Sequence, residues 1–155
     1  EETWRESWNL KVFGYINLCR LFYRKMKEVK EGVILNIIGA AAVKVNYNYI
    51  AGTTGNAGLT AFTRALSNGS TYHGVRVLGI SPGLTTSDRM ITMMKGSAKE
   101  KFDDEDRWPE LFKDLPFERA AKAEEVADLA TFLVSPRSAY TSGTIITLDA
   151  GSSNH

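Results

Sequence analysis

An apolar run, a long helical pattern and a second apolar run follow one another within residues 32–83. The first run, GVILNIIGAAA, covers Gly32 to Ala42, and the second, VRVLGISPG, covers Val75 to Gly83. Between them, the stretch from Tyr49 to Asn68 reads YIAGTTGNAGLTAFTRALSN, with small and apolar side chains at helical spacing. This order is typical of a parallel crossover unit, whose ligands bind at the carboxyl ends of the strands. The sequence therefore predicts an α/β fold with functional residues near the start of the central helix.

The central helix pattern has two neighbouring faces of small or apolar residues. Ala57, Ala61 and Ala65 recur every fourth residue, and Leu59 and Leu66 lie on the adjoining stripe. We expect one face to cover the sheet and the other to meet a second helix, of this chain or of another subunit. A purely structural helix would show the same periodicity.

Size, charge and cysteine content limit the classes of function. With 155 residues and 43% hydrophobic content, the chain can bury the core of one domain. The formal charge of +1 provides no strong field for nucleic acid or an anionic membrane, so a small-molecule partner is expected. Cys19 is the only cysteine, and His73 and His155 are far apart in sequence, so no metal site is predicted. No apolar run of roughly 18 residues and no signal-peptide pattern are present, which favours a cytoplasmic location.

Three segments resemble, in order and spacing, the carboxyl-terminal portion of a short-chain dehydrogenase/reductase. They are GNAGLTAFTRAL in the central helix, SPGLTTSDRM after the second strand, and EEVADLATFLVSPRSAYTSGTIITLDAG near the end of the chain. The resemblance implies a three-layer, Rossmann-like, doubly wound parallel sheet with NAD or NADP as the cofactor. It also implies interconversion of a hydroxyl and a carbonyl on a small substrate, which the methionine-rich segment after Asp88 suggests is partly apolar.

The chain opens on a helical pattern, from Thr3 to about Lys27, and not on a strand. No G-x-G-x-x-G turn precedes this helix, and the resemblance places such a dinucleotide-binding turn earlier in the chain. We therefore expect residues 1–155 to be the carboxyl-terminal part of a single Rossmann-like domain without its amino-terminal dinucleotide-binding strands. Because their absence would leave a sheet edge unpaired, the missing portion is expected to exist as another segment. Residues 88–119 are the expected substrate-covering segment.

The resemblance places unusual residues at all four catalytic positions of the family. Lys11 stands at the asparagine position, Gly39 at the serine, Gly52 at the tyrosine and Asn56 at the lysine. Tyr49 precedes Gly52 by three residues and would lie above it if the helix has already begun. Tyr49 and Lys11 are therefore the candidate catalytic residues, with the ammonium favouring ionisation of the phenol. The alternative is that Lys11 reaches solvent and Tyr49 is an ordinary loop residue.

The candidate cofactor-binding residues come from the central helix and from the end of the second strand. By resemblance, Asn56 would bond a ribose hydroxyl, and the backbone after Pro82 and Gly83 would meet the nicotinamide carboxamide. The hydroxyls of Thr85 and Ser87 would help to hold the cofactor.

Two classes of function remain open. One is an NAD(P)-dependent oxidoreductase with an atypical proton donor, and the other is a non-catalytic nucleotide-binding or scaffolding relative. Self-association as a dimer or tetramer is expected through the first and central helices, which offer more apolar surface than one sheet face needs.

Overall fold

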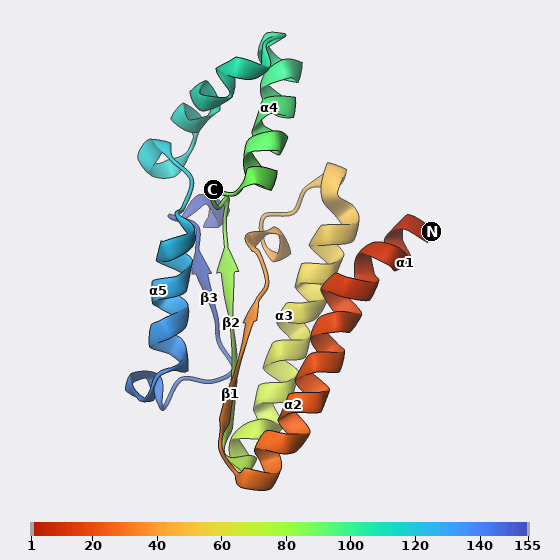
Figure 1. The fold of residues 1–155 in the computed structure, drawn as a ribbon, viewed down its shortest axis with the longest axis vertical. Helices are drawn as coiled ribbons and strands as arrows, with labels where there is room; N and C mark the ends of the chain where they lie inside the picture. Colours follow the sequence, from red (N-terminus) through yellow and green to blue (C-terminus); the bar gives the residue numbers. More distant parts are fainter. Residues whose placement is uncertain (1, 155) are drawn as a thin grey trace.

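The computed structural model describes residues 2–154, so Glu1 and His155 lie outside the described residues. A parallel sheet of three strands, in the order β1-β2-β3, lies between two layers of helices (Figure 1). The strands are β1 (Gly32–Ile37), β2 (Val75–Pro82) and β3 (Ile145–Leu148). Helices α2 (Tyr15–Val29) and α3 (Ile50–Ser70) cover one face, and α5 (Ala123–Val134) covers the other. The predicted three-layer α/β fold is confirmed.

The first helical segment is continuous but not uniform. It comprises α1 (Glu2–Trp8), a π-helical stretch at Asn9–Gly14, and α2, which ends at Val29 before the left-handed residue Lys30. The sequence predicted one helix from Thr3 to about Lys27. A π-helical turn contains an extra residue, so it changes the direction of the side chains on it. Lys11 lies within this turn.

The core has one apolar cluster on each face of the sheet, because successive strand residues point to opposite faces. On the α2–α3 face, Val75 and Val77 pack with Phe62 and Leu66 of α3. On the α5 face the cluster is built around Leu133, with the residues Leu78, Ile80, Val126 and Leu129. Phe132 of the same helix lies outside this cluster and is 46% exposed.

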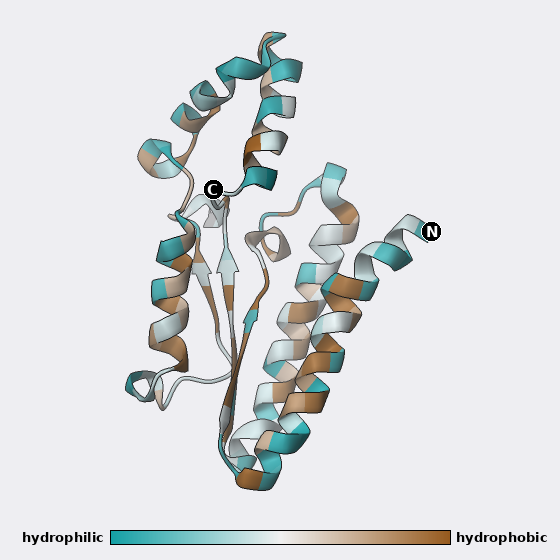
Figure 2. Ribbon diagram, in the orientation of Figure 1, coloured by the Kyte–Doolittle hydropathy of each residue, from teal (hydrophilic) through white to brown (hydrophobic). Residues whose placement is uncertain are grey.

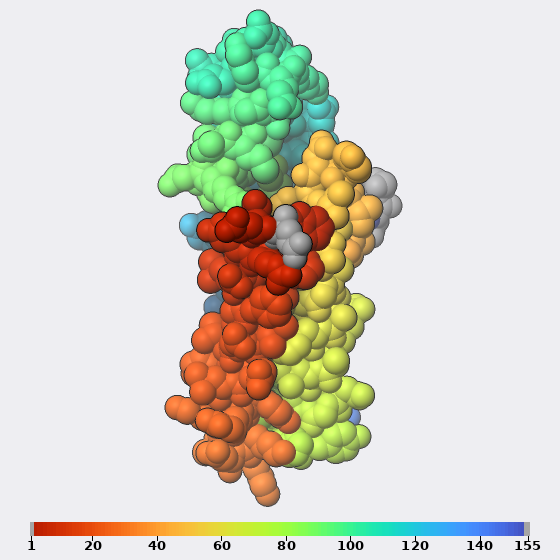
Figure 3. All heavy atoms as spheres, turned by 90° about the vertical axis from the view of Figure 1, so that its right-hand side faces the viewer, coloured from red at the N-terminus to blue at the C-terminus, as the bar shows by residue number. Residues whose placement is uncertain are grey.

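Helix α3 is buried on one side only. Leu59 is fully buried, whereas Ala57, Ala61 and Ala65 are exposed. The second packing partner that we expected for the alanine face is therefore not supplied by the described chain. Figure 3 shows α1, α2 and α3 side by side on one face of the molecule.

The segment after β2 forms a small unit of its own beyond the carboxyl ends of the strands (Figure 1). It contains α4 (Asp88–Phe102) and 3-10 helical turns at Glu105–Asp114 and Pro116–Glu118. Met90 and Met94 are buried against aromatic and aliphatic side chains of the same segment, namely Trp108, Leu111 and Phe112. The methionines therefore pack on their own segment, apart from Met93, which is 54% exposed.

One edge of β1 is open in the described chain. The Ile38 amide donates to Ile80 of β2, so by strand alternation the backbone groups of Val33, Leu35 and Ile37 point to the opposite edge. A groove of about 410 Å³ runs beside this edge, between β1 and the apolar side chains of α2. Figure 2 shows hydrophobic residues along both elements. Among residues 2–154, no helix is both long and apolar enough to cross a membrane.

Candidate functional site

The start of α3 packs against the first helical segment near the carboxyl end of β1. The Trp8 indole Nε1 donates to the Ala51 carbonyl at 3.0 Å. A Cβ on Gly55 would lie 3.1 Å from Cγ2 of Val12, so the two helices approach closely at this glycine. These contacts bring the first turns of α3 beside the π-helical turn that carries Lys11.

Tyr49 lies directly over Gly52, as the spacing of three residues predicted. A Cβ on Gly52 would be 2.0 Å from Cζ of Tyr49 and 2.1 Å from its Cε1. The ring therefore fills the space in which any side chain at position 52 would begin. Tyr49 is 47% exposed, so its phenol remains accessible from solvent.

Lys11 is anchored to the end of β1. Its ammonium donates to the Ile38 carbonyl at 2.7 Å and to the Ile37 carbonyl at 3.5 Å. It also lies 5.1 Å from the centroid of the Tyr15 ring. Burial lowers the pKa of Lys11, because desolvation disfavours the ammonium. The hydrogen-bond partners of Lys11 are thus backbone carbonyls and not the Tyr49 phenol.

Sequence reasoning missed Tyr15. Its hydroxyl donates to the Ile37 carbonyl at 2.7 Å, on the open edge of β1. Burial is the largest cause of the raised pKa of Tyr15. The available signal was the spacing of four residues from Lys11, which places both side chains on one side of the helix.

Asn56 is buried beside Gly39. It is 4% exposed, and a Cβ on Gly39 would lie 3.5 Å from both Nδ2 and Oδ1 of Asn56. Within the described residues its Oδ1 makes no hydrogen bond, and neither do the buried hydroxyls of Thr53 and Ser81. Buried polar atoms are nearly always hydrogen-bonded in folded proteins, so an unpaired amide oxygen needs an external donor. Asn56 therefore presents a buried acceptor that no described residue satisfies.

The residues at the end of β2 have clear structural partners. A Cβ on Gly83, which follows Pro82, would lie 2.8 Å from the Asp149 Cβ, so glycine is needed here for the approach of the chain after β3. The Thr85 hydroxyl donates to the Gly83 carbonyl at 3.1 Å. The Ser87 hydroxyl accepts from the Met90 amide at 3.1 Å and caps α4. These residues lie together after β2, but each hydroxyl already has a hydrogen bond.

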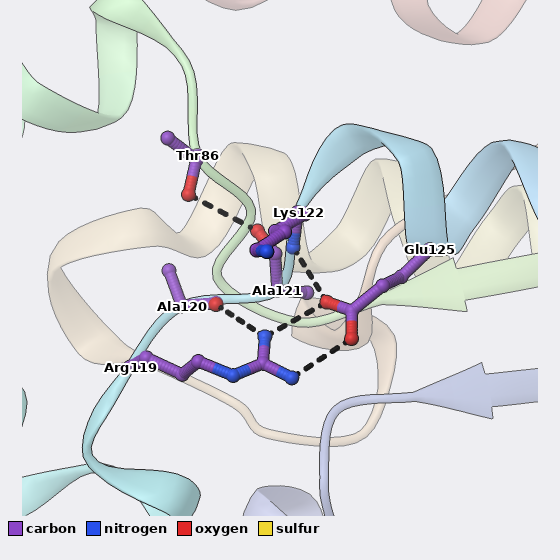
Figure 4. Close-up of polar contacts among 6 residues, drawn as sticks. All are labelled: Thr86, Arg119, Ala120, Ala121, Lys122 and Glu125. Carbon is purple, nitrogen blue, oxygen red and sulfur yellow. Dashed lines mark hydrogen bonds and ion pairs between the residues drawn. The ribbon is translucent and has the colours of Figure 1, made fainter.

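An ion pair beside the amino end of α5 holds the loop that leads into this helix (Figure 4). Arg119 binds both carboxylate oxygens of Glu125 at 2.8 Å, and the Lys122 amide donates to the same carboxylate at 2.7 Å. The hydrogen bond from Arg119 is the largest cause that lowers the pKa of Glu125 to about 2. The Thr86 hydroxyl donates to the Ala121 carbonyl at 3.2 Å, which ties this loop to the chain after β2.

A profile of the family described as Enoyl-(Acyl carrier protein) reductase matches residues 1–153. The chain belongs to the short-chain dehydrogenase/reductase family. The family assignment agrees with the resemblance of the three sequence segments and with the parallel sheet. Among residues 2–154, no group of three or more His, Cys, Asp or Glu side chains is arranged to hold a metal ion.

Known short-chain dehydrogenases/reductases match almost all of this chain. It is 26% identical to the 7alpha-hydroxysteroid dehydrogenase of Escherichia coli K12, covering 95% of this chain and 54% of that protein. It is 30% identical to the 3-oxoacyl-(acyl-carrier-protein) reductase FabG of Chlamydia trachomatis, covering 97% and 57% respectively. The chain thus spans little more than half the length of these relatives.

Solved structures of the family show the same arrangement. The L-sorbose reductase of Gluconobacter frateurii, complexed with NADPH and L-sorbose, is 25% identical and has a TM-score of 0.89. That match covers 100% of this chain and 60% of the reductase. The 7alpha-hydroxysteroid dehydrogenase complexed with NADH is 26% identical, has a TM-score of 0.81, and is matched over 96% of this chain and 55% of its own.

Proposed function

We propose that the protein is an NAD(P)-dependent oxidoreductase that interconverts a hydroxyl and a carbonyl on a small, partly apolar substrate. The observation that carries this proposal is the buried Asn56 amide, whose Oδ1 has no hydrogen-bond donor among residues 2–154. A ribose hydroxyl of either NAD or NADP fits this acceptor, and Asn56 occupies the lysine position of the family. The relatives solved with NADH and with NADPH support the same class of cofactor.

The proposed reaction needs one hydride and one proton. When bound, the nicotinamide cofactor supplies or accepts the hydride. In the reducing direction, the Tyr49 phenol donates its proton to the substrate carbonyl oxygen, and in the oxidising direction the phenolate takes the proton of the hydroxyl. The exposure of Tyr49 and its place at the start of α3 support this role.

Lys11 is proposed to act on this site through its anchor. Its ammonium holds the Ile38 carbonyl, which immediately precedes Gly39 and therefore fixes the turn against which Asn56 lies. Pro82, Gly83, Thr85 and Ser87 are proposed to position the cofactor through the backbone of the turn after β2.

The organisation of the whole protein is part of the same proposal. Residues 1–155 are the carboxyl-terminal part of a single Rossmann-like domain, and the open edge of β1 pairs with a further parallel strand of that domain. Residues 88–119 cover the substrate, because they project beyond the carboxyl ends of the strands (Figure 1). Cys19 is buried and forms no disulfide, which suits the reducing conditions of the cytoplasm.

We also propose a homodimer or homotetramer built on the face of α1, α2 and α3. The exposed alanine stripe of α3 lets another helix approach closely, and α2 offers Leu21, which is 45% exposed and lies outside the groove beside β1. Surfaces of this kind are typical of contacts between subunits.

Replacing Tyr49 with Phe, with Tyr47→Phe as a matched control, tests the function. Tyr47 is two residues away and 86% exposed. Nicotinamide absorbance is followed with a panel of alcohols and ketones. We expect turnover in the unaltered protein, a loss of about 10²-fold in Tyr49→Phe, and little change in Tyr47→Phe. Tight binding of NADH or NADPH without turnover on the whole panel would instead support the non-catalytic alternative.

A further inference from the structure

The turn at Tyr47–Tyr49 directs the Tyr49 side chain over the first turn of α3. The Asn46 side chain accepts from the Asn48 amide at 2.8 Å, and the Tyr49 amide donates to the Asn46 carbonyl at 3.0 Å. Tyr49 itself has a φ of −133° and a ψ of 39°, outside the helical region, while Ile50 is already helical. This change of direction places the phenol ring against the first turn of α3.

Gly52 is the residue on which that ring rests. The Cζ, Cε1 and Cε2 atoms of Tyr49 lie 2.0, 2.1 and 2.6 Å from the position of a Cβ on Gly52. Real Cβ atoms do not approach other carbons so closely, so no other amino acid at position 52 is compatible with this ring position.

The backbone alone does not explain glycine at this position. Gly52 lies inside α3 and is not one of the glycines with a positive φ. Glycine in a helix interior is unfavourable relative to alanine, because more backbone entropy is lost on folding. The Tyr49 ring is the contact that a side chain at position 52 would meet, whereas a Cβ on Gly58 or Gly69 of the same helix would meet nothing within 4 Å.

We infer that Gly52 is a positioning residue that seats the Tyr49 ring, so that a phenol is supplied to the site from position 49 and not from position 52. The catalytic part of this inference rests on the proposed function, whereas the seating of the ring does not. Tyr49 and Gly52 thus act as a pair. Because position 52 has no side chain, the Tyr49 ring can lie over it.

Thermal unfolding of the full chain tests the seating without any assay of activity. The variants are Gly52→Ala, Tyr49→Ala and the double variant, with Gly69→Ala as the control. Gly69 lies in the same helix, and a Cβ there would meet nothing within 4 Å. Alanine at an open helical position should raise Tm by about 2 to 4 °C.

The effect of Gly52→Ala on Tm should depend on whether Tyr49 is present. The ring is the far end of an exposed side chain and can move, so with Tyr49 present we expect Gly52→Ala to raise Tm by less than Gly69→Ala does, and in the Tyr49→Ala background to raise it by as much. An equal rise of Tm in both backgrounds would overturn the inference, because the ring would then not occupy this space.

Turnover tests the functional part separately. We expect Gly52→Ala to lower kcat by about 10-fold or more with little change in KM for the cofactor, and to add nothing further in a Tyr49→Phe background. Gly69→Ala should leave both parameters unchanged. A gain in Tm that depends on the Tyr49 background, together with an equal kcat loss in the unaltered and Tyr49→Phe backgrounds, would keep the seating and overturn the positioning role in catalysis. An absence of turnover in the unaltered protein would count against the proposed function and not against the seating.

Discussion

The side-chain amide of Asn56 lies against Gly39, with 3.5 Å between each of its polar atoms and the position of a Cβ on that glycine. These residues occupy the lysine and serine positions of the family, so two of the replaced positions are neighbours in the fold. Gly39 also has a φ of 132°, which side-chain-bearing residues rarely adopt. The serine of the family therefore does not fit this backbone as it stands.

Gly39→Ser is expected to destabilise the chain and not to improve catalysis. The strained φ should lower the free energy of unfolding by about 1 to 3 kcal/mol, measured by urea denaturation. Gly96→Ala is the control, because Gly96 lies in α4 and a Cβ there would meet nothing within 4 Å. A Gly39→Ser variant of undiminished stability would contradict the backbone argument.

Asn56→Ala is expected to weaken cofactor binding more than it weakens the fold. Loss of one hydrogen bond to a ribose hydroxyl should raise the Kd for NADH or NADPH by about 10-fold. Stability should fall less than for most buried amides, because Oδ1 has no partner within the part of the chain that the structure describes. Calorimetric titration measures the Kd, with Asn68→Ala on the exposed side of α3 as the control. Unchanged affinity for both cofactors would show that Asn56 does not bind the cofactor.

The sequence predicted the elements whose signals are local. Helix α5, Ala123–Val134, carries such a signal, because its apolar period is regular and Glu124 and Glu125 mark its start. Tyr49 was placed over Gly52 by helical spacing alone. The π-helical turn at Asn9–Gly14 was not predicted, since one extra residue in a helix leaves almost no trace in the period of its side chains.

The sequence did not predict contacts between residues that lie far apart along the chain. Lys11 was expected to act beside Tyr49 or to reach solvent, but its ammonium donates to a carbonyl 27 residues further along the chain. The contact of Asn56 with Gly39 likewise joins residues from different elements, whose proximity depends on the crossover and not on any local pattern. The packing of a helix face is also decided by neighbours, which is why the alanine stripe of α3 could be recognised but its exposure could not.

Ala61→Glu is expected to disrupt self-association. A charge at the centre of the exposed alanine stripe would be desolvated and sterically excluded in a close helix contact, so the protein should dissociate to monomers. Light scattering at micromolar concentration measures the mass. Ser97→Glu, on an exposed position of α4 away from this face, should leave the mass unchanged. A monomer before any substitution would contradict the proposed oligomer.

Glu125→Gln is expected to change how stability depends on pH. The pKa of Glu125 is lowered to about 2 by Arg119, so its contribution is present above about pH 4.5 and is lost as the pH falls toward 2. The variant should therefore be less stable than the unaltered chain at neutral pH, with the difference shrinking through this window. Thermal unfolding across the pH range measures it, and Glu124→Gln is the neighbouring control. A difference that stays constant with pH would show that the ion pair does not contribute.

Lys11→Met is expected to slow the reaction through loss of the hydrogen bond to Ile38. Methionine keeps much of the length of the side chain but removes the ammonium that holds the Ile38 carbonyl. Without this hydrogen bond the turn at Gly39, against which Asn56 lies, is less well held, so the rate near neutrality should fall by about 10²-fold. The pH profile of kcat/KM measures the change.

Lys11→Arg separates the charge from the particular amine. Burial lowers the pKa of Lys11 below its ordinary 10.5, so the ammonium loses its proton earlier in the alkaline range than an exposed lysine does. Because the folded chain then binds fewer protons than the unfolded chain, stability should rise with pH between the lowered pKa and 10.5, and this rise should vanish in both variants. Arginine stays charged throughout and should keep most of the rate near neutrality. If Lys11→Met leaves both the pH profile and the cofactor affinity unaltered, Lys11 has only the structural role of anchoring the end of β1.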